Sequence, residues 1–298
     1  MHSHDHGHKD LTVRRLIYSI FLNFAITASE IAGGLLSNSL SLISDALHNL
    51  TDTFAMVISL FARLISKKPI SPSKTFGYKR AEIIAAFINI TVLIAISLFL
   101  FKEAFYRIFN PAEINGSLMF VIAVIGLAGN LISAVLLYKS AKNNINIKSA
   151  FIHILSDALS SIAVILTGIL IIFKEWYILD PVLTFLIGIY VMIQSWHMLM
   201  KVIHILMQGA PSNVNLDILK NKTETVEGVK NIHHIHIWSL TEELIHFEAH
   251  VSINTCDLEK IEAIKGSIKA ILREDFNISH STIEFETENC TSPGTFGQ

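Results

Sequence analysis

The stretch that decides the fold is SLISDALHNLTD, residues 41–52, which places three ionisable side chains in an otherwise apolar run. The run continues with FAMVI, residues 54–58, and is interrupted by Asp45, His48 and Asp52. A charge at the centre of a bilayer costs about 2.5–3.5 kcal/mol on insertion scales. If this run is a membrane helix, its ionisable residues therefore indicate a functional site.

The composition is that of a membrane protein. Of the 298 residues, 51% are hydrophobic and only 16% are charged, whereas soluble proteins carry about 25% charged residues. A formal net charge of −2 gives no indication of nucleic-acid binding. The only cysteines, Cys256 and Cys290, suggest no disulfide framework. The polar N-terminus predicts no cleavable signal peptide.

Hydropathy predicts six membrane spans, because each span needs about 20 mostly apolar residues. The apolar runs cover residues 15–36, 40–65, 82–106, 117–138, 149–173 and 178–206. Lysine and arginine are concentrated on one side of these spans, which predicts that both termini are cytoplasmic. The residues on that side are Lys9, Arg14, Arg15, Arg63, Lys67, Lys68, Lys74, Lys79, Arg80, Lys139, Lys142, Lys148 and Lys201. The opposite side has Lys102, Arg107 and Lys174.

The composition becomes that of a soluble domain after LMQGAP, residues 206–211. Apolar periodicity in residues 212–290 predicts the order helix, strand, strand, helix, strand, and therefore a small α+β domain. About 80 residues is near the lower limit for independent folding, so a partner subunit would support the domain. We expect four parts: a His-rich disordered tail, six membrane helices, a cytoplasmic metal-binding and dimerisation domain, and a second disordered tail. Their bounds are 1–11, 12–208, 209–290 and 291–298.

Two matched pairs define a candidate metal site in the membrane. His48 and Asp52 are four residues apart, as are His153 and Asp157. In a helix this spacing places both side chains of a pair on one face. Two imidazoles and two carboxylates suit tetrahedral Zn²⁺, with Cd²⁺, Co²⁺, Mn²⁺ and Fe²⁺ as competitors.

A structural explanation competes with metal binding. A lone His or Asp in a membrane helix often only forms a hydrogen bond with a neighbouring helix. Two such pairs in separate spans, with the third and fourth spans almost free of charge, favour a metal site. Asp45 and Glu30 are expected in structural or pathway roles. Asp45 is also suited to accept a hydrogen bond from a metal-bound imidazole.

Several motifs together resemble the cation diffusion facilitator family, particularly its zinc-transporting branch. The resemblance covers roughly residues 12–288. The motifs are EIAGGLLSNSLSLISDALHNLTD (30–52), TFGYKRAE (75–82), HILSDALSS (153–161), LDPVLTFLIGIYV (179–191), LMQGAP (206–211) and HHIHIWSL (233–240).

The resemblance implies a homodimer in a lipid bilayer, with six helices per subunit and a ferredoxin-like or metallochaperone-like cytoplasmic domain. Such proteins exchange cytoplasmic divalent metal for protons, so Zn²⁺ and H⁺ would be substrates. No enzymatic activity, catalytic residue, cofactor or nucleic-acid partner is implied. The transport site falls on His48, Asp52, His153 and Asp157. The reduced loop KSAKNNINIKS, residues 139–149, indicates a bacterial type, and hence the inner membrane.

In the cytoplasmic domain, the ligands that the resemblance implies match His233, His250 and Glu286. The family's fourth ligand position holds Ser279 here, and we expect the neighbouring His280 to substitute for it. Strand alternation places His234 and His236 on the face opposite Ile235 and Ile237. The loop SPSKTFGYKR, residues 71–80, has neither His nor Asp, so no metal site is expected in it unless the N-terminal histidines supply ligands.

Two other functions compete with metal transport. An intramembrane metalloenzyme would require H-E-x-x-H or an open metal position, but the sequence has no H-E-x-x-H and the four ligands would close the shell. A metal sensor is disfavoured because no signalling module is appended. The N-terminal histidines at positions 2, 4, 6 and 8 indicate either weak metal binding or an inert tail.

Overall fold

The computed structural model describes the backbone of residues 6–141 and 145–287. Side chains are described from residue 21 to 287, apart from 52, 56, 59, 63 and 139–150. The chain forms two compact units: residues 1–61 with 88–199, and residues 62–87 with 200–298.

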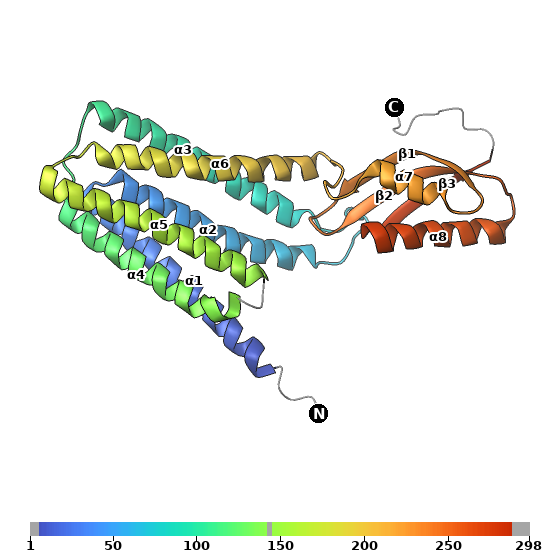
Figure 1. The fold of residues 1–298 in the computed structure, drawn as a ribbon, viewed down its shortest axis with the longest axis horizontal. Helices are drawn as coiled ribbons and strands as arrows, with labels where there is room; N and C mark the ends of the chain where they lie inside the picture. Colours follow the sequence, from blue (N-terminus) through green and yellow to red (C-terminus); the bar gives the residue numbers. More distant parts are fainter. Residues whose placement is uncertain (1–5, 142–144, 288–298) are drawn as a thin grey trace. The chain divides into compact units, whose positions relative to one another are not determined.

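Six long helices follow one another from the N-terminus, as the hydropathy predicts (Figure 1). They are α1 (His6–Ser37), α2 (Leu40–Ser66), α3 (Ala81–Phe109), α4 (Gly116–Ala141), α5 (Ile145–Lys174) and α6 (Leu179–Leu206). Among the residues searched, α3 to α6 contain stretches long and apolar enough to cross a membrane, and Phe21–Ser37 is a shorter apolar stretch. The prediction of a polytopic helical membrane protein is confirmed.

The start of α1 differs from the predicted boundary. The helix begins at His6, within the segment 1–11 that the sequence predicts to be disordered. This segment has no proline and one glycine, so little in it opposes helix formation. Residues 1–5 and the predicted tail 291–298 lie outside the described part of the chain.

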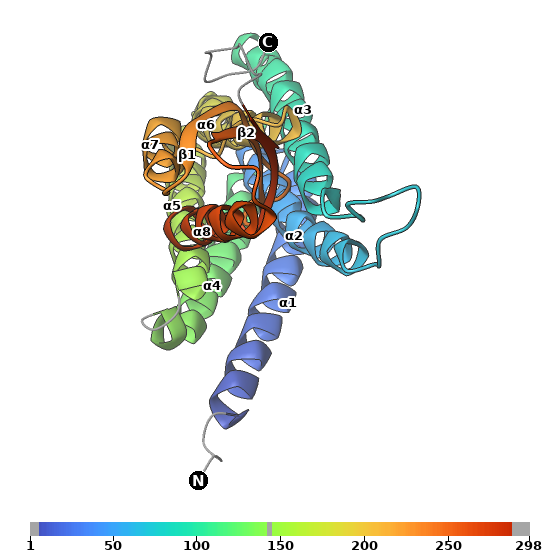
Figure 2. The same ribbon diagram turned by 90° about the vertical axis from the view of Figure 1, so that its right-hand side faces the viewer.

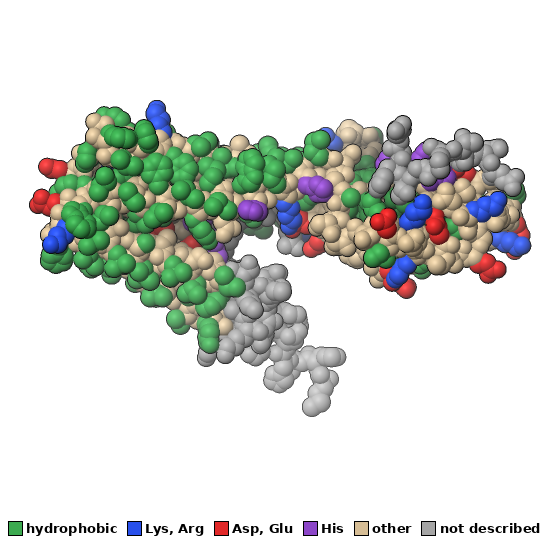
Figure 3. Space-filling view, turned by 45° about the horizontal axis from the view of Figure 1, so that its top comes forward, with side chains coloured by type: hydrophobic (Ala, Val, Ile, Leu, Met, Phe, Trp, Pro, Cys, Tyr) green, Lys and Arg blue, Asp and Glu red, His purple; other side chains and the backbone are tan. Residues whose placement is uncertain are grey.

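The surface of the first unit explains why these helices need lipid. Large apolar side chains that point outward include Phe99, Leu166 and Leu186, each more than half exposed. Figure 3 shows such side chains spread along the long helices, with few charges between them. In a soluble monomer an apolar surface of this kind would favour aggregation.

The second unit contains the predicted α+β domain. Its elements are α7 (Leu216–Glu224), β1 (Val229–Ser239), β2 (Ile245–Ile253), α8 (Leu258–Phe276) and β3 (His280–Glu286). The sheet order is β1-β2-β3, with β1 antiparallel and β3 parallel to β2. Both helices pack on one face of the sheet (Figure 2), around a core that includes Leu219, Phe247 and Ile268. The element order predicted from periodicity is confirmed.

A bulge interrupts the pairing of β1 with β2. His233 pairs with His250 and His236 pairs with Glu248, so three steps along β1 face two steps along β2. His234 is in the left-handed backbone region, with φ 50°. An extra residue in one strand locally breaks the alternation of faces. The bulge therefore places two consecutive histidines near β2.

Candidate metal centres

In the first unit, three of the four predicted transport ligands converge. His48 Nε2 on α2 is 4.0 Å from Asp157 Oδ1, and His153 Nε2 is 3.7 Å from Asp157 Oδ2. The two imidazole centroids are 5.9 Å apart, with the rings nearly perpendicular at 74°. Both imidazoles thus face one carboxylate, although His48 and His153 are 105 positions apart in sequence. The side chain of Asp52 lies outside the described residues, so its participation stays a prediction.

These ligands open onto a pocket. Its volume is about 490 Å³, and its lining includes Asp45, His48, His153 and Asp157, together with apolar residues of α6 such as Leu186. A few polar groups that converge in a mostly apolar cavity are typical of a ligand site. The pocket therefore gives a small cation access to both imidazoles.

Asp45 and Glu30 lie in the hydrogen-bonded interior beside this site. Asp45 is 1% exposed and accepts hydrogen bonds from the hydroxyls of Ser160 and, at 3.5 Å, Ser161 on α5. Glu30 on α1 is fully buried, and its Oε2 accepts a hydrogen bond from Asn49 Nδ2 at 3.2 Å. Both carboxyl groups thus link helices, and their part in the transport site or pathway stays a prediction.

A glycine on α4 makes room for Glu30. A Cβ atom built on Gly126 would collide with Glu30 Oε1. Any larger residue there would therefore displace the buried carboxyl group. The helices thus leave space for this buried carboxyl group.

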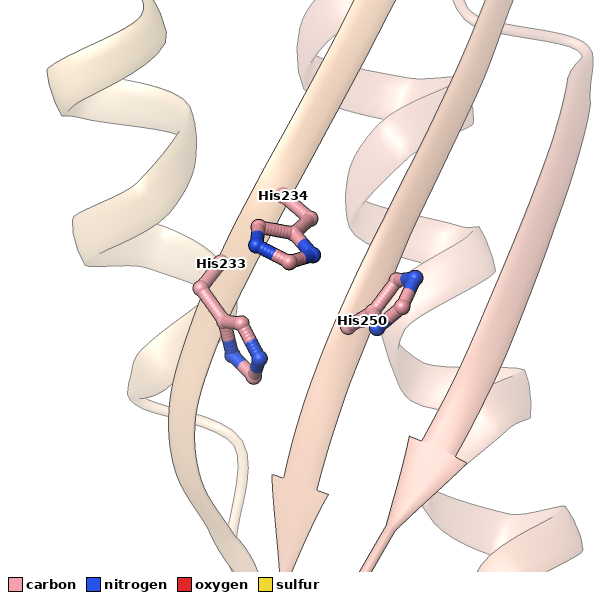
Figure 4. Close-up of side chains that lie close together, drawn as sticks. All are labelled: His233, His234 and His250. Carbon is pink, nitrogen blue, oxygen red and sulfur yellow. The ribbon is translucent and has the colours of Figure 1, made fainter. Parts of the chain in front are cut away.

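A second cluster lies on the sheet of the second unit. His233, His234 and His250 each offer a ligand atom within 4.8 Å of the others (Figure 4). Glu286 joins them, with Oε1 2.6 Å from His250 Nδ1 and Oε2 3.3 Å from His233 Nε2. Three imidazoles and a carboxylate are a ligand set suited to Zn²⁺.

Burial favours the metal-binding form of His233. The ring is 1% exposed, and this burial lowers its pKa, although the neighbouring Glu286 carboxylate opposes the shift. A neutral imidazole keeps the lone pair that binds metal.

The structure changes the predicted cluster at two positions. His234 belongs to it, and sequence reasoning missed this because it assumed regular alternation along the strand. His280 lies outside it, because the parallel register pairs His280 with His246 and places Glu284 opposite His250. Four residues along a parallel strand correspond to about 13 Å. His280 therefore does not substitute for the missing ligand at Ser279.

Family comparisons cover nearly the whole chain. Residues 16–207 match the family model of the cation efflux transmembrane domain. Residues 211–288 match that of the cation efflux protein cytoplasmic domain.

Three curated relatives are similar over at least 90% of their own length. A protein of Bacillus velezensis named cadmium, cobalt and zinc/H(+)-K(+) antiporter is 38% identical, over 95% of this chain and 92% of its own. The metal cation efflux system protein CzcD of Cupriavidus metallidurans is 36% identical, over 96% and 90%. The zinc transporter ZitB of Escherichia coli is 33% identical, over 98% and 94%.

One solved structure is also similar in sequence. The metal-bound C-terminal domain of the CzcD transporter from Cupriavidus metallidurans is 33% identical. It covers 24% of this chain and 99% of its own, with a TM-score of 0.23.

Proposed function

The chain belongs to the cation efflux family, and we propose that it exports cytoplasmic Zn²⁺ in exchange for protons. The observation that carries this proposal is the convergence of His48 and His153 on the two oxygens of Asp157, inside an apolar helical unit. With Asp52 one turn after His48 as the fourth ligand, the set has two nitrogens and two oxygens, which suits Zn²⁺.

The exchange follows from the chemistry of these ligands. Zn²⁺ binds neutral imidazole and ionised carboxylate, so metal and protons compete for the same groups. Facing the cytoplasm, the site loses protons and binds Zn²⁺; facing the opposite side, protons displace the metal. His48 and His153 are suited to this role because imidazole titrates near neutral pH.

Proton return also reduces the electrical cost of export. If one proton enters for each Zn²⁺, one net positive charge leaves. Against an inside-negative potential this costs about 2.3 kcal/mol per 100 mV. Each further proton per cycle offsets one such charge.

We further propose that the cluster of His233, His234, His250 and Glu286 binds regulatory Zn²⁺ in a homodimer. The chain would then divide into a membrane domain, 12–208, and a cytoplasmic domain, 209–290. The two family matches, at residues 16–207 and 211–288, support this division. Both termini then lie in the cytoplasm of a bacterium, with the helices in its inner membrane. The bacterial source of the relatives supports a bacterial membrane. The concentration of lysine and arginine on one side of the spans supports this orientation.

Transport of Cd²⁺ or Co²⁺ is the second candidate. The name of the Bacillus velezensis relative includes both metals, and the same nitrogen and oxygen ligands accept them. Hydrolysis is disfavoured, because four protein ligands would leave no position for an attacking water.

The test is transport by the purified full chain in proteoliposomes. Vesicles loaded with a pH dye receive Zn²⁺, Cd²⁺, Co²⁺, Mn²⁺ or Fe²⁺ in turn, with and without a K⁺ gradient. Zn²⁺ uptake with alkalinisation of the lumen is expected, at a rate that a K⁺ gradient does not change. Zn²⁺ uptake without proton movement would contradict antiport, and the absence of metal uptake would contradict the function itself.

A further inference from the structure

A second pair of histidines lies on the sheet, outside the cluster already described. The rings of His246 on β2 and His280 on β3 have centroids 4.5 Å apart, because these residues are paired in the parallel register. This is closer than any pair of imidazoles in the first cluster, whose centroids are 4.9 to 5.6 Å apart. The two rings are thus near enough to share an ion.

The environment of His246 leaves one of its nitrogens without a hydrogen bond. The residue is 4% exposed, and its Nε2 is buried with no hydrogen-bond partner among the described residues. A buried polar atom in this state is unfavourable unless a ligand satisfies it. Burial, together with the nearby His280, lowers the pKa of His246, so the ring is neutral at cytoplasmic pH.

Aromatic side chains hold this ring in place. Trp238 stacks on His246 with centroids 5.5 Å apart and planes at 21°. Phe76 contacts the same ring edge to face, at 5.3 Å. The other ring, His280, is exposed and is therefore free to rotate toward an ion. One fixed imidazole and one adjustable imidazole are together a workable pair of metal ligands.

We propose that His246 and His280 form a second cytoplasmic cation site, for a divalent metal that prefers imidazole, such as Zn²⁺ or Ni²⁺. Water completes its coordination on the solvent side of His280. The site is separate from the first cluster, because His250 lies four residues along β2, about 13 Å away. It rests on the geometry of the domain alone and does not depend on the transport proposal.

The competing explanation is a histidine that serves only as part of an aromatic core. In that case His246 would be needed for packing with Trp238 and Phe76, while the exposed His280 would be dispensable. The two explanations therefore differ in what they predict for metal binding after His280 is removed.

Trp238 provides a local reporter for the test. The chain has three tryptophans, and Trp176 and Trp196 are both exposed apolar residues of the helical unit. Replacing these two by Phe leaves Trp238 as the only indole. Ni²⁺ quenches indole fluorescence at short range, so titration of the full single-tryptophan chain in detergent reports an ion at His246.

The expected result is saturable quenching that Zn²⁺ reverses by competition. His280→Ala should raise the apparent Kd for Ni²⁺ about tenfold or more, because half of the protein ligands are lost. His236→Ala, an exposed histidine on the neighbouring strand, and His250→Ala in the first cluster should leave the Kd unchanged. An unchanged Kd in His280→Ala, or quenching that His250→Ala abolishes, would overturn the proposal. Failure of transport with quenching intact would affect only the proposed function.

Discussion

The carboxylate of Asp180 on α6 accepts a hydrogen bond from the backbone N–H of Leu40, at 2.7 Å and across 140 positions of sequence. It also accepts bonds from the hydroxyls of Ser39 and Ser41, each at 2.6 Å, and from the Ser41 N–H at 3.1 Å. The first N–H groups of a helix have no partner within the helix. Asp180 supplies that partner for α2, and so ties together the helix that bears His48 and α6.

Loss of this cap should destabilise the membrane unit. We expect Asp180→Ala to lower the free energy of unfolding by about 2 kcal/mol or more, because it removes a charged acceptor from buried donors. Thermal unfolding of the full chain in detergent measures this. Glu103→Ala is the matched control, since its ion pair with Arg107 is partly exposed and contributes at most about 1 kcal/mol. Equal unfolding temperatures for the two variants would contradict the role of Asp180.

Removal of the shared carboxylate should stop transport without unfolding the protein. Asp157→Ala leaves His48 and His153 in place on α2 and α5 but removes the carboxylate oxygens that both imidazoles face. We expect Zn²⁺ uptake into proteoliposomes at the rate of protein-free vesicles. Unfolding temperature and dimer mass should match the wild type, and a wild-type uptake rate would rule out the assigned site.

His48 should determine the choice of metal. His48→Asp leaves one nitrogen and three carboxylates, a harder set of ligands. We expect the uptake rates of Mn²⁺ and Cd²⁺ to rise relative to that of Zn²⁺ in a competition assay with the full chain. The measurement is the ratio of initial uptake rates, and an unchanged metal ranking would show that position 48 does not set selectivity.

The first cytoplasmic cluster should couple Zn²⁺ to stability. A ligand that binds only the folded state at about 100 times its Kd adds about 2.7 kcal/mol. Added Zn²⁺ should therefore raise the unfolding temperature of the domain, followed by Trp238 fluorescence in the chain lacking the other two tryptophans. His250→Ala should remove most of this shift, while transport continues with weaker dependence on cytoplasmic Zn²⁺. A full shift in that variant would show that the ion binds elsewhere.

The stability of this domain should also depend on pH when a chelator removes metal. Burial lowers the pKa values of His233 and His246, whereas the unfolded residues titrate near about 6.5. The unfolded state therefore binds protons first as the pH falls. Stability should be complete above about pH 6.5 and should decrease below it. His246→Phe should reduce this slope and His236→Ala should not; equal slopes in all three proteins would contradict the effect of burial.

Sequence periodicity was sufficient for the long elements. The six apolar runs and the order of strands and helices follow from local patterns that each segment carries by itself. The convergence of His48 with Asp157 was also predictable. Ionisable side chains at i, i+4 in two apolar helices have few polar partners other than each other. The cap formed by Asp180 was missed, since no local pattern connects it with Leu40.

The cytoplasmic ligands show where local reasoning fails. His234 adopts φ 50° although it is not a glycine, so nothing in the sequence marks the bulge that brings it to His250. His280 was assigned to the wrong neighbour because the register of β3 on β2 depends on a crossover through α8. The register of β3 on β2 is set by packing of the whole domain, and the positions of the histidines in the sequence do not reveal it.

The parallel ladder of β2 and β3 has a genetic consequence. Asn277, in the left-handed conformation at φ 55°, ends α8 three residues before β3 begins. Deletion of one codon between them would slide β3 by one position and turn its side chains to the opposite face. Glu286 would then leave His250 and His280 would leave His246 in a single event. A single missense change removes one of these two contacts, whereas an in-frame deletion at this point removes both.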